Sequence, residues 1–595
     1  MSKIQTALLG TILISSLHSS AQKISADGAP QTFVFVSEQY FNDVLFHFSP
    51  TSGTSAGLHQ YDTQLEDYSA ENITRANTAL HGYESRISAI DPSALDASMA
   101  ADRQILLNSI RSTLLTNEVI RPWEKDPNFY SSGITGSVFV IMSRDYAPVN
   151  TRLKAAIARE QLMPAALLEA RKNLKTPPKI FTEIALEQIN GIVSFFEKDV
   201  PSAFSDCNDP AIKSNFVKSN AAVIAALKSY GEWMKSDLLP RSNGNYQLGA
   251  DTFTKKLSYD EMVDIPLDRL LEVAYADLHH NQAEFARIAK EVDPSKTPQE
   301  VLAELATIHP APDKLLSAFQ DTFDSLISFI KDHHIITIPS VVQPTLEETP
   351  PFERATTQAS MDSPGPFETH SKKAYFNVTL PEKDWTPEHV AEHMAAFNVG
   401  TVVSTSVHEA YPGHYVQFLW QNQFPSKIRK LIGANTNIEG WAHYCEQMML
   451  DQGYAAAPAN ATPDQVRQAK LIRLGQLQDA LLRDARFVVA IKLHTGQGNP
   501  GGTPWTIDQA VDFFVKDGYQ SHSVGLVETK RGTSDATYLY YTLGKLQIMK
   551  LREDLKAKQG AAFNLQNFHD TLMQQGTAPI KVIRKAMLHD DSPVL

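Results

Sequence analysis

The stretch from His408 to His414, which reads His-Glu-Ala-Tyr-Pro-Gly-His, constrains this chain more than any other feature. Glu439 follows it downstream. Catalytic zinc sites are built from such imidazoles and carboxylates, with three protein ligands and one position kept for water. The stretch therefore predicts a zinc site whose ligands are His408, His414 and Glu439. Glu409, next to a ligand but not bound itself, would be the general base.

The spacing of the two histidines differs from the common zinc motif, in which they lie four residues apart. Positions four apart lie about 40° apart around a helix axis, whereas positions six apart lie about 240° apart. An undistorted helix would therefore point His408 and His414 away from each other. Pro412 cannot donate its helical hydrogen bond, and Gly413 tolerates dihedral angles that other residues avoid. We therefore expect a two-residue bulge there that brings His414 back to the face of His408.

The residues around this motif resemble those of the bacterial domain-of-unknown-function family 885 (DUF885). The resemblance rests on His408 to His414, Glu439 to Tyr444, Arg531 to Asp535 and Tyr538 to Gly544, and more weakly on Trp123 to Tyr130. Members of the family are often exported or lipid-anchored, and the family is grouped with the thermolysin-like (gluzincin-type) zinc metallopeptidases. The resemblance implies a mostly helical metallopeptidase with the same three metal ligands and the same base.

Two residues near the C-terminus are further candidates. By the resemblance, Tyr541 matches a tyrosine three residues before a glycine, here Gly544, and its phenol could donate to a developing oxyanion. Arg531 could hold the C-terminal carboxylate of a peptide through a two-pronged contact. The alternatives are a salt bridge for Arg531 and buried packing for Tyr541. Ala536 stands where the family often has proline, which leaves the shape of this loop open.

A second histidine pair offers a rival metal site. The run from His389 to His393 fits the inverted zinc motif His-x-x-Glu-His, with both histidines on one helix face. It falls in the first turns after a helix start at Thr386-Pro387, where polar residues on a solvated surface are expected. A metal bound there would leave Glu409 and Glu439 without a role, so we favour a solvated helix.

The predicted helix that carries Glu439 holds two more residues of interest. His443 lies one turn after Glu439 and could support that carboxylate from outside the ligand set, or it could be a packed histidine. Cys445 and Cys207 are the only cysteines. They could pair in an oxidising compartment, but Cys445 is more typical of a buried small apolar residue.

Length and periodicity predict a mainly helical protein. At 595 residues the chain exceeds what one hydrophobic core usually supports. Apolar residues recur at three- and four-residue spacing in 64–118, 151–235 and 259–335. We predict a multi-helix, two-lobed metallopeptidase-like fold with a deep cleft and a small β element near the active site. A helical lobe would span residues 22–250, and a second lobe with the zinc site residues 251–595.

Two runs are predicted to be strands, Gln31 to Phe35 and Ala374 to Leu380. The second follows residues 338–371, where repeated prolines favour extended chain over helix. Thermolysin-like peptidases hold a peptide against a sheet-edge strand, whose backbone reads the peptide main chain. We therefore expect Tyr375 and Asn377 to contact substrate, although a short structural hairpin would explain the run equally well.

The N-terminus is typical of an export signal. Lys3 supplies a positive charge, Ala7 to Leu17 a short apolar core and Ser19-Ser20-Ala21 small residues for cleavage, so residues 1–21 are predicted to be a signal peptide. The apolar core is too short to span a bilayer stably. We expect a periplasmic or secreted protein with no stable membrane insertion after cleavage.

The overall charge argues against nucleic acid as a partner. The formal net charge is −13, whereas binding to phosphate backbones needs clustered Lys and Arg. The oligomeric state does not follow from the sequence.

These features together predict an exported zinc-dependent peptidase with a peptide substrate. A closed helical cleft favours short peptides, which indicates an exopeptidase or oligopeptidase, carboxypeptidase-like if Arg531 holds a carboxylate. Two alternatives stay open: a periplasmic peptide-binding protein without turnover, and an amidase acting on cell-wall or other non-protein amides. A binding protein has no need of a base beside a metal ligand, which argues against the first.

Overall fold

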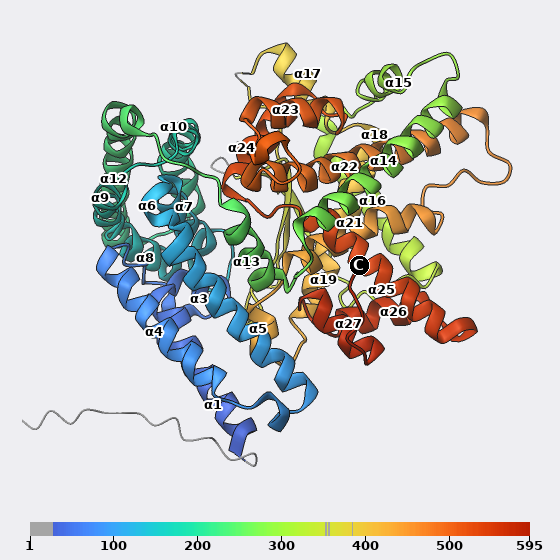
Figure 1. Ribbon diagram of the computed structural model, residues 1–595. Coiled ribbons are helices and arrows are strands. Elements are labelled where there is room, and N and C mark those ends of the chain that lie inside the picture. Colours follow the sequence, from blue (N-terminus) through green and yellow to red (C-terminus); the bar gives the residue numbers. More distant parts are fainter. Residues whose placement is uncertain (1–27, 351–353, 355–356, 384) are drawn as a thin grey trace, which may run out of the picture.

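The computed structural model of the protein describes residues 28–350, 354, 357–383 and 385–595. Helices dominate these residues, as predicted, and the strands among them form one small sheet. The N-terminal helices gather on one side of the molecule and most later helices on the other (Figure 1). No helix in the described part of the chain is long and apolar enough to cross a bilayer. The predicted signal peptide, residues 1–21, lies outside the described residues.

The helices and strands have the following bounds. The N-terminal helices are α1 (Ala29–Tyr40), α2 (Phe46–Phe48), α3 (Pro50–Ser55), α4 (Ala70–Ser88), α5 (Ala97–Leu114), α6 (Pro122–Lys125), α7 (Asn128–Met142), α8 (Val149–Glu160), α9 (Met163–Asn173), α10 (Lys179–Ser194), α11 (Val200–Ala203), α12 (Pro210–Trp233) and α13 (Gly249–Glu261). The central elements are α14 (Leu267–Val292), α15 (Pro298–Leu305), α16 (Leu315–Asp332), β1 (Thr345–Glu348), β2 (Ala359–Asp362), β3 (Tyr375–Val378), α17 (Pro387–Ala395), α18 (Val399–Glu409) and α19 (His414–Gln421). The C-terminal helices are α20 (Lys427–Leu431), α21 (Asn435–Asp451), α22 (Pro463–Thr495), α23 (Ile507–Lys516), α24 (His522–Ser534), α25 (Tyr540–Gln559), α26 (Leu565–Met573) and α27 (Ile580–Leu588).

Local chemistry at the helix starts explains where several helices begin. The Thr386 side chain accepts a hydrogen bond from the His389 N–H and caps α17, as predicted. Thr462 and Gln465 form a reciprocal capping box at the start of α22, which runs for 33 residues. α22 contacts α14, α18, α21 and α25, and it therefore packs against the helices that carry the candidate site.

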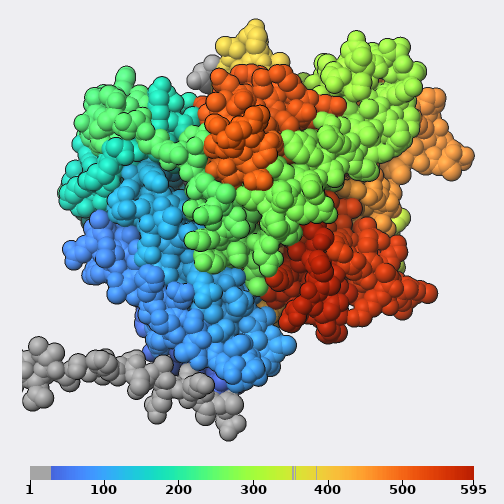
Figure 2. All heavy atoms as spheres, viewed as in Figure 1, coloured from blue at the N-terminus to red at the C-terminus, as the bar shows by residue number. Residues whose placement is uncertain are grey.

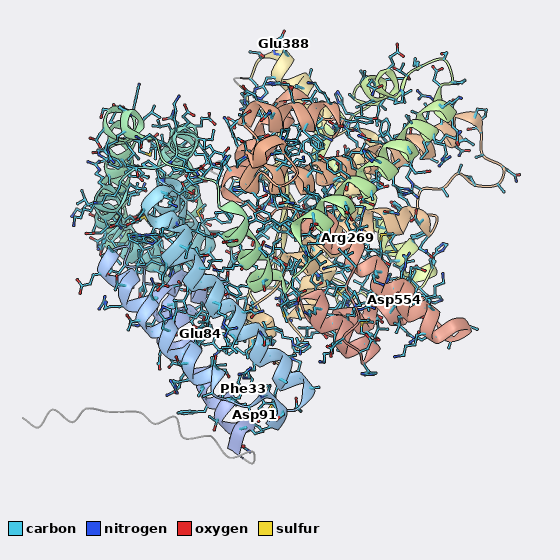
Figure 3. The ribbon with its side chains drawn as sticks, viewed as in Figure 1. Phe33, Glu84, Asp91, Arg269, Glu388 and Asp554 are labelled. Atoms are coloured by element: carbon cyan, nitrogen blue, oxygen red, sulfur yellow. The ribbon has the colours of Figure 1, made fainter. Side chains whose placement is uncertain are left out.

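The strand expected from Gln31 to Phe35 is wrong, because these residues lie in α1. Phe33, labelled in Figure 3, is buried together with Val36 and Tyr40, at the three- and four-residue spacing of a helix. Phe35, which made the run look continuously apolar, is 61% exposed. A short apolar run fits either periodicity, so the buried residues beyond it decide for helix.

The predicted strand from Ala374 to Leu380 is present as β3, but it is not at the sheet edge. β3 is the central strand, parallel to β1 and antiparallel to β2. Both of its backbone edges are therefore paired, and the prediction that this strand holds a peptide main chain is wrong. Both partner strands come from the proline-rich segment 338–371, which was expected to be extended chain but not to pair with this strand.

Several hydrophobic clusters hold the helices together. One cluster joins buried residues of α1, α4 and α5 with residues of α16, α18, α21, α25 and α27. A second is confined to residues 68–238, and two more are built mainly on α14 and α22. N-terminal and later helices also contact each other directly, as Figure 2 shows on one face and as α5 with α20 and α10 with α24 illustrate. The division at residue 250 and the deep cleft stay predictions.

Candidate metal centre

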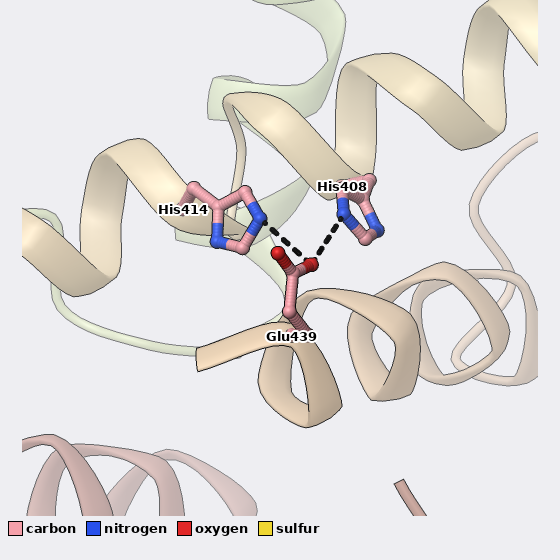
Figure 4. Close-up of side chains that lie close together, drawn as sticks. All are labelled: His408, His414 and Glu439. Atoms are coloured by element: carbon pink, nitrogen blue, oxygen red, sulfur yellow. Dashed lines mark ion pairs between the residues drawn. The ribbon is translucent and has the colours of Figure 1, made fainter. Parts of the chain in front are cut away.

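His408 and His414 lie on two different helices that meet at a sharp break. α18 ends at Glu409, and α19 begins at His414. The Tyr411–Pro412 peptide bond between them is cis. The two-residue bulge expected here is therefore a complete interruption of the helix rather than a bulge. The expected consequence holds, because the two imidazole ring centroids lie only 4.8 Å apart (Figure 4).

Gly413 makes this break possible. A Cβ atom at this position would lie 1.8 Å from the backbone oxygen of His408, so no other residue could bring the chain this close to the end of α18. The Gly413 N–H also donates to the carbonyl oxygen of Val407 at 3.0 Å. The proline-glycine pair thus places His414 at the first position of α19, beside His408.

Glu439 reaches the histidines from α21, which is tied to the break. The indole N–H of Trp441 donates to the carbonyl oxygen of Pro412 at 2.9 Å. α21 also packs closely against α25, since a Cβ atom on Gly440 would lie 2.5 Å from the Cα of Gly544. The residues next to Glu439 therefore set both the distance of α21 from the histidines and its distance from α25.

The start of α21 is held by a buried carboxylate from the end of α13. Glu261 accepts hydrogen bonds from the backbone N–H of Asn435 at 3.2 Å and of Thr436 at 2.8 Å. These are N–H groups that a helix start leaves without a partner inside the helix. Burial raises the pKa of Glu261 to about 7, although the hydrogen bonds from Thr436 oppose this.

The ligand atoms of the three residues have the spacing of a metal site. Oε2 of Glu439 lies 3.3 Å from Nε2 of His408 and 3.3 Å from Nε2 of His414 (Figure 4). Among the described residues, Oε2 of Glu439 has no hydrogen-bond partner, so these contacts are not hydrogen bonds. Ligands at about 2.0–2.1 Å from a tetrahedral ion lie about 3.3–3.4 Å from each other. Both distances from Glu439 therefore match a zinc ion, and the three ligand atoms all lie within 4.8 Å of one another.

No other group of this kind occurs in the part of the chain that the structure describes, where His408, His414 and Glu439 are the one set of three or more His, Cys, Asp or Glu residues able to hold a metal. The two histidine side chains are nearly buried, whereas that of Glu439 is 21% exposed. Burial acts to raise the pKa of Glu439, but the two histidines outweigh it and hold the pKa well below its usual range. The carboxylate is therefore ionised and ready to bind a cation.

Glu409 lies beside this group without taking part in it. Its side chain is buried, and its Oε2 has no hydrogen-bond partner among the described residues. Burial raises the pKa of Glu409, opposed in part by the nearby His408 and His414. A buried carboxylate with a free oxygen and a raised pKa is suited to accept a proton from a molecule placed at the site.

Glu446 is a functional candidate that the sequence analysis missed. Its Oε1 accepts the Nδ1–H of His408 at 2.6 Å, so Nε2 is the ring nitrogen that faces Glu439. Its Oε2 lies 3.1 Å from Nδ1 of His443. His443 therefore supports Glu446 rather than Glu439, and the role predicted for it is corrected. The signal was present, because 439, 443 and 446 share one helix face at the spacing i, i+4, i+7.

Arg483 of α22 balances the charge of Glu446, with Nη2 3.0 Å from Oε1. Burial acts to raise the pKa of Glu446, but Arg483 and His443 outweigh it and hold the pKa far below its usual range. Burial acts to lower the pKa of His408, but Glu439 and Glu446 outweigh it and raise the pKa to about 9. Burial lowers the pKa of His443 to about 3, so that ring is neutral.

Tyr541 and Arg531 meet next to the metal group. The ring of Tyr541 lies 6.3 Å from the ring of His408, centroid to centroid. Nη2 of Arg531 donates to the Tyr541 hydroxyl at 3.0 Å. Burial raises the pKa of Tyr541, and Arg531 opposes this in part. The phenol therefore keeps its proton at neutral pH and can donate a hydrogen bond.

Comparison with known proteins gives this chain a family. The family model DUF885, described as a bacterial protein of unknown function, matches residues 50–587. The chain belongs to this family. The matched region contains all the residues of the candidate metal centre. Among curated proteins, none matches the chain.

Two solved structures resemble this DUF885 protein over nearly its whole length. One is a candidate lipoprotein of unknown function from Shewanella oneidensis, with 24% identity and a TM-score of 0.74, covering 93% of this chain and 99% of that one. The other is a candidate lipoprotein from Colwellia psychrerythraea, with 19% identity and a TM-score of 0.76, covering 95% of this chain and 99% of that one. At these identities the likeness establishes a shared fold.

The rival motif of this DUF885 protein does not form a metal group. His389 stacks on Trp385 with ring centroids 3.9 Å apart, and Nε2 of His393 lies 2.9 Å from the carbonyl oxygen of Thr379. α17 lies at the outer edge of the molecule, where Figure 3 labels Glu388. The solvated helix favoured from the sequence describes it better than a metal site does.

The remaining residues singled out in the sequence are Asn377, Tyr375 and the two cysteines. Asn377 is buried on the central strand, with its Nδ2 3.4 Å from Oγ of Ser360, and Tyr375 is partly buried on the same strand. No hydrogen bond, ion pair or ring contact joins either residue to the metal group among the described residues. Cys207 and Cys445 are both free and buried, so they do not pair.

Proposed function

We propose that this protein is an exported zinc-dependent peptidase that hydrolyses short peptides, as an exopeptidase or oligopeptidase. One observation carries the proposal: two histidine nitrogens each lie 3.3 Å from the same carboxylate oxygen. Beside them, the buried Glu409 keeps an oxygen free of hydrogen bonds to described residues. A site that only bound a metal for stability would be closed by a fourth protein ligand and would need no such neighbour.

The chemistry divides among the residues as follows. Zinc held by His408, His414 and Glu439 would supply an acidified water molecule. Glu409 would accept the proton of that water on Oε2 and deliver it to the leaving amine. Tyr541 would donate its hydroxyl proton in a hydrogen bond to the substrate carbonyl oxygen as negative charge develops there. Glu446 would hold His408 in the tautomer whose Nε2 faces the centre.

Export is part of the proposal and rests on separate observations. Lys3 and the short apolar core from Ala7 to Leu17 are typical of a signal peptide. The solved relatives are described as candidate lipoproteins, a class that is exported, which supports a periplasmic or secreted location.

Metal analysis combined with peptide digestion tests the proposal. We expect the protein purified after export to carry one zinc per chain and to cleave members of a mixed peptide library, with cleavage lost on chelation and restored by zinc. Mass spectrometry of the products would map the cut sites. Peptide binding without cleavage, unaffected by chelator, would instead favour a binding protein, and cleavage of cell-wall amides alone would favour an amidase.

A further inference from the structure

Three arginines surround the ring of Tyr541, and they differ in how their charges are balanced. Arg486, Arg531 and Arg483 place their guanidinium carbons 4.7, 5.6 and 5.8 Å from the ring centroid. Arg486 forms a buried two-pronged pair with Glu528, at 2.6 and 2.7 Å. Arg483 is paired with the buried Glu446. These two cations are therefore neutralised inside the protein.

Arg531 is not neutralised in the same way. Its Nη2 carries all its hydrogen bonds to described residues, at 3.0 Å to Tyr541, 3.3 Å to Asp535 and 3.5 Å to Tyr540. None of the described residues accepts a hydrogen bond from its Nη1 or Nε. The ion pair of Arg531 with Asp535 is a single contact between side chains that are 28% and 29% exposed, whereas that of Arg486 with Glu528 is two-pronged and buried. The N–H groups of Nη1 and Nε are therefore each available to donate a hydrogen bond to a carboxylate.

The contacts of Nη2 hold the guanidinium of Arg531 in place. Asp535 accepts a hydrogen bond from the Tyr540 hydroxyl at 2.7 Å, which holds the carboxylate beside Nη2. Lys530, the preceding residue on α24, points elsewhere and pairs with Glu187 of α10 at 2.7 Å. The positive charge next to Tyr541 thus belongs to Arg531 and not to a general basic surface of α24.

We propose that Arg531 binds the free C-terminal carboxylate of the substrate, so that the enzyme releases one or two residues from the C-terminus of short peptides. This rests on the function proposed above. Tyr541 contacts Arg531 through its hydroxyl and lies beside the ring of His408, so the guanidinium and the metal ligands are about one tyrosine side chain apart. That length is on the order of two residues of extended chain. A hydrogen bond from a free guanidinium N–H to a carboxylate is charge-assisted and roughly twice as strong as a neutral one.

Peptide pairs that differ only at the C-terminus test this binding mode. Zinc-loaded wild-type protein is compared on matched peptides with a free C-terminal carboxylate and with a C-terminal amide. We expect a preference for the free acid on the order of 10- to 100-fold in kcat/KM, the size of a hydrogen bond to a charged group. Arg531→Met should abolish the preference, because it slows cleavage of the free acid more than cleavage of the amide; any slowing common to both peptides reports the loss of its contact with Tyr541. Lys530→Met removes a neighbouring charge and should leave the preference intact.

Binding to an inactive variant separates failure of this inference from failure of the proposed function. Zinc-loaded Glu409→Gln is titrated with the same peptides, with and without Arg531→Met, and the dissociation constants are compared. Tighter binding of the free acid that depends on Arg531 supports the inference even if the wild type cleaves nothing. Equal binding and equal cleavage of acid and amide would overturn it, while leaving a peptidase of another specificity.

Discussion

Two pairs of histidines occupy neighbouring helices of this protein, and only the less regular pair converges. His389 and His393 lie four apart on α17, the spacing that places two side chains on one helix face. His408 and His414 lie six apart across the break between α18 and α19, yet both meet the same oxygen of Glu439. Motif spacing alone would have favoured the first pair.

The difference lies in burial and in the partners that surround each pair. Nε2 of His393 lies beside a backbone oxygen, and the ring of His389 stacks on Trp385. Neither ring forms an ion pair with a carboxylate among the described residues. Around His408, by contrast, Glu439 lies at Nε2 and Glu446 at Nδ1, both in a buried region. A metal site needs ligands that point at one centre and neighbours that hold them there.

The largest expected effect is the loss of metal from the convergent pair. Replacing His408 or His414 by Ala removes one of three ligands, so we expect one-to-one zinc binding and peptide cleavage to disappear. The same change at His389 or His393 should leave the zinc content at that of the wild type. Elemental analysis of dialysed protein measures both. Loss of zinc from the His389 and His393 variants, with zinc kept by the His408 and His414 variants, would mean that the metal binds at α17 instead.

The next effect concerns the glutamate that accompanies each pair. Glu409→Gln keeps the shape of the side chain but cannot accept a proton, so we expect cleavage to fall about 10²- to 10⁴-fold with zinc retained. Glu392→Gln is the matched control, since Glu392 accepts a hydrogen bond from Ser523 and is not part of the metal group of the described residues. Steady-state kinetics and zinc content of the two variants are compared. Full activity of Glu409→Gln would mean that another group is the base.

A smaller effect is expected at Glu446, which orients His408. Glu446→Gln should weaken zinc binding about 10- to 100-fold, the usual cost of losing such a partner. Because it leaves Arg483 buried without its carboxylate, the variant is also studied together with Arg483→Met, which removes both charges. Asp451→Asn, on the same helix but paired with Arg473, is the control. Competition with a zinc chelator gives the affinities, and an unchanged value in both Glu446 variants would contradict the role.

Much of the fold and of the centre followed from the sequence, for physical reasons that can be named. Helical periodicity and the cap at Thr386 are local properties that predicted what the structure has. The proline-glycine pair at 412–413 predicted that the two histidines meet, although the helix is interrupted there rather than bulged. Glu446 was missed because the spacing that places it on one face with Glu439 and His443 does not show that His408 of α18 packs against that face. The prediction that β3 is an edge strand was wrong for the same reason. β1 and β2 pair with it from the segment 338–371, whose prolines predict extended chain but not which strand it pairs with.

The smallest expected effect is on stability, and it concerns the contact that His393 makes with the backbone. Its ring contacts the Thr379 carbonyl oxygen, so His393→Ala should lower the free energy of unfolding by about 0.5–1.5 kcal/mol near pH 8 with zinc binding unchanged. Burial lowers the pKa of His393, although the Thr379 contact opposes this. The unfolded chain then binds more protons than the folded one below about pH 6.5, so the stability that His393 provides is lost as the pH falls.

Thermal unfolding of wild type and His393→Ala at pH 8 and pH 5 measures this difference. We expect the variant to melt below the wild type at pH 8 and the gap to narrow at pH 5, because the variant has no ring to protonate. His389→Ala is the control, because the ring of His389 stacks on Trp385 but forms no hydrogen bond with a backbone group among the described residues. A gap that widens at pH 5 would mean that the charged form of His393 is the stabilising one. α17 would then carry a positively charged imidazole that stabilises the fold. The two histidine pairs would then differ in the charge of their rings rather than in the contacts that their rings make.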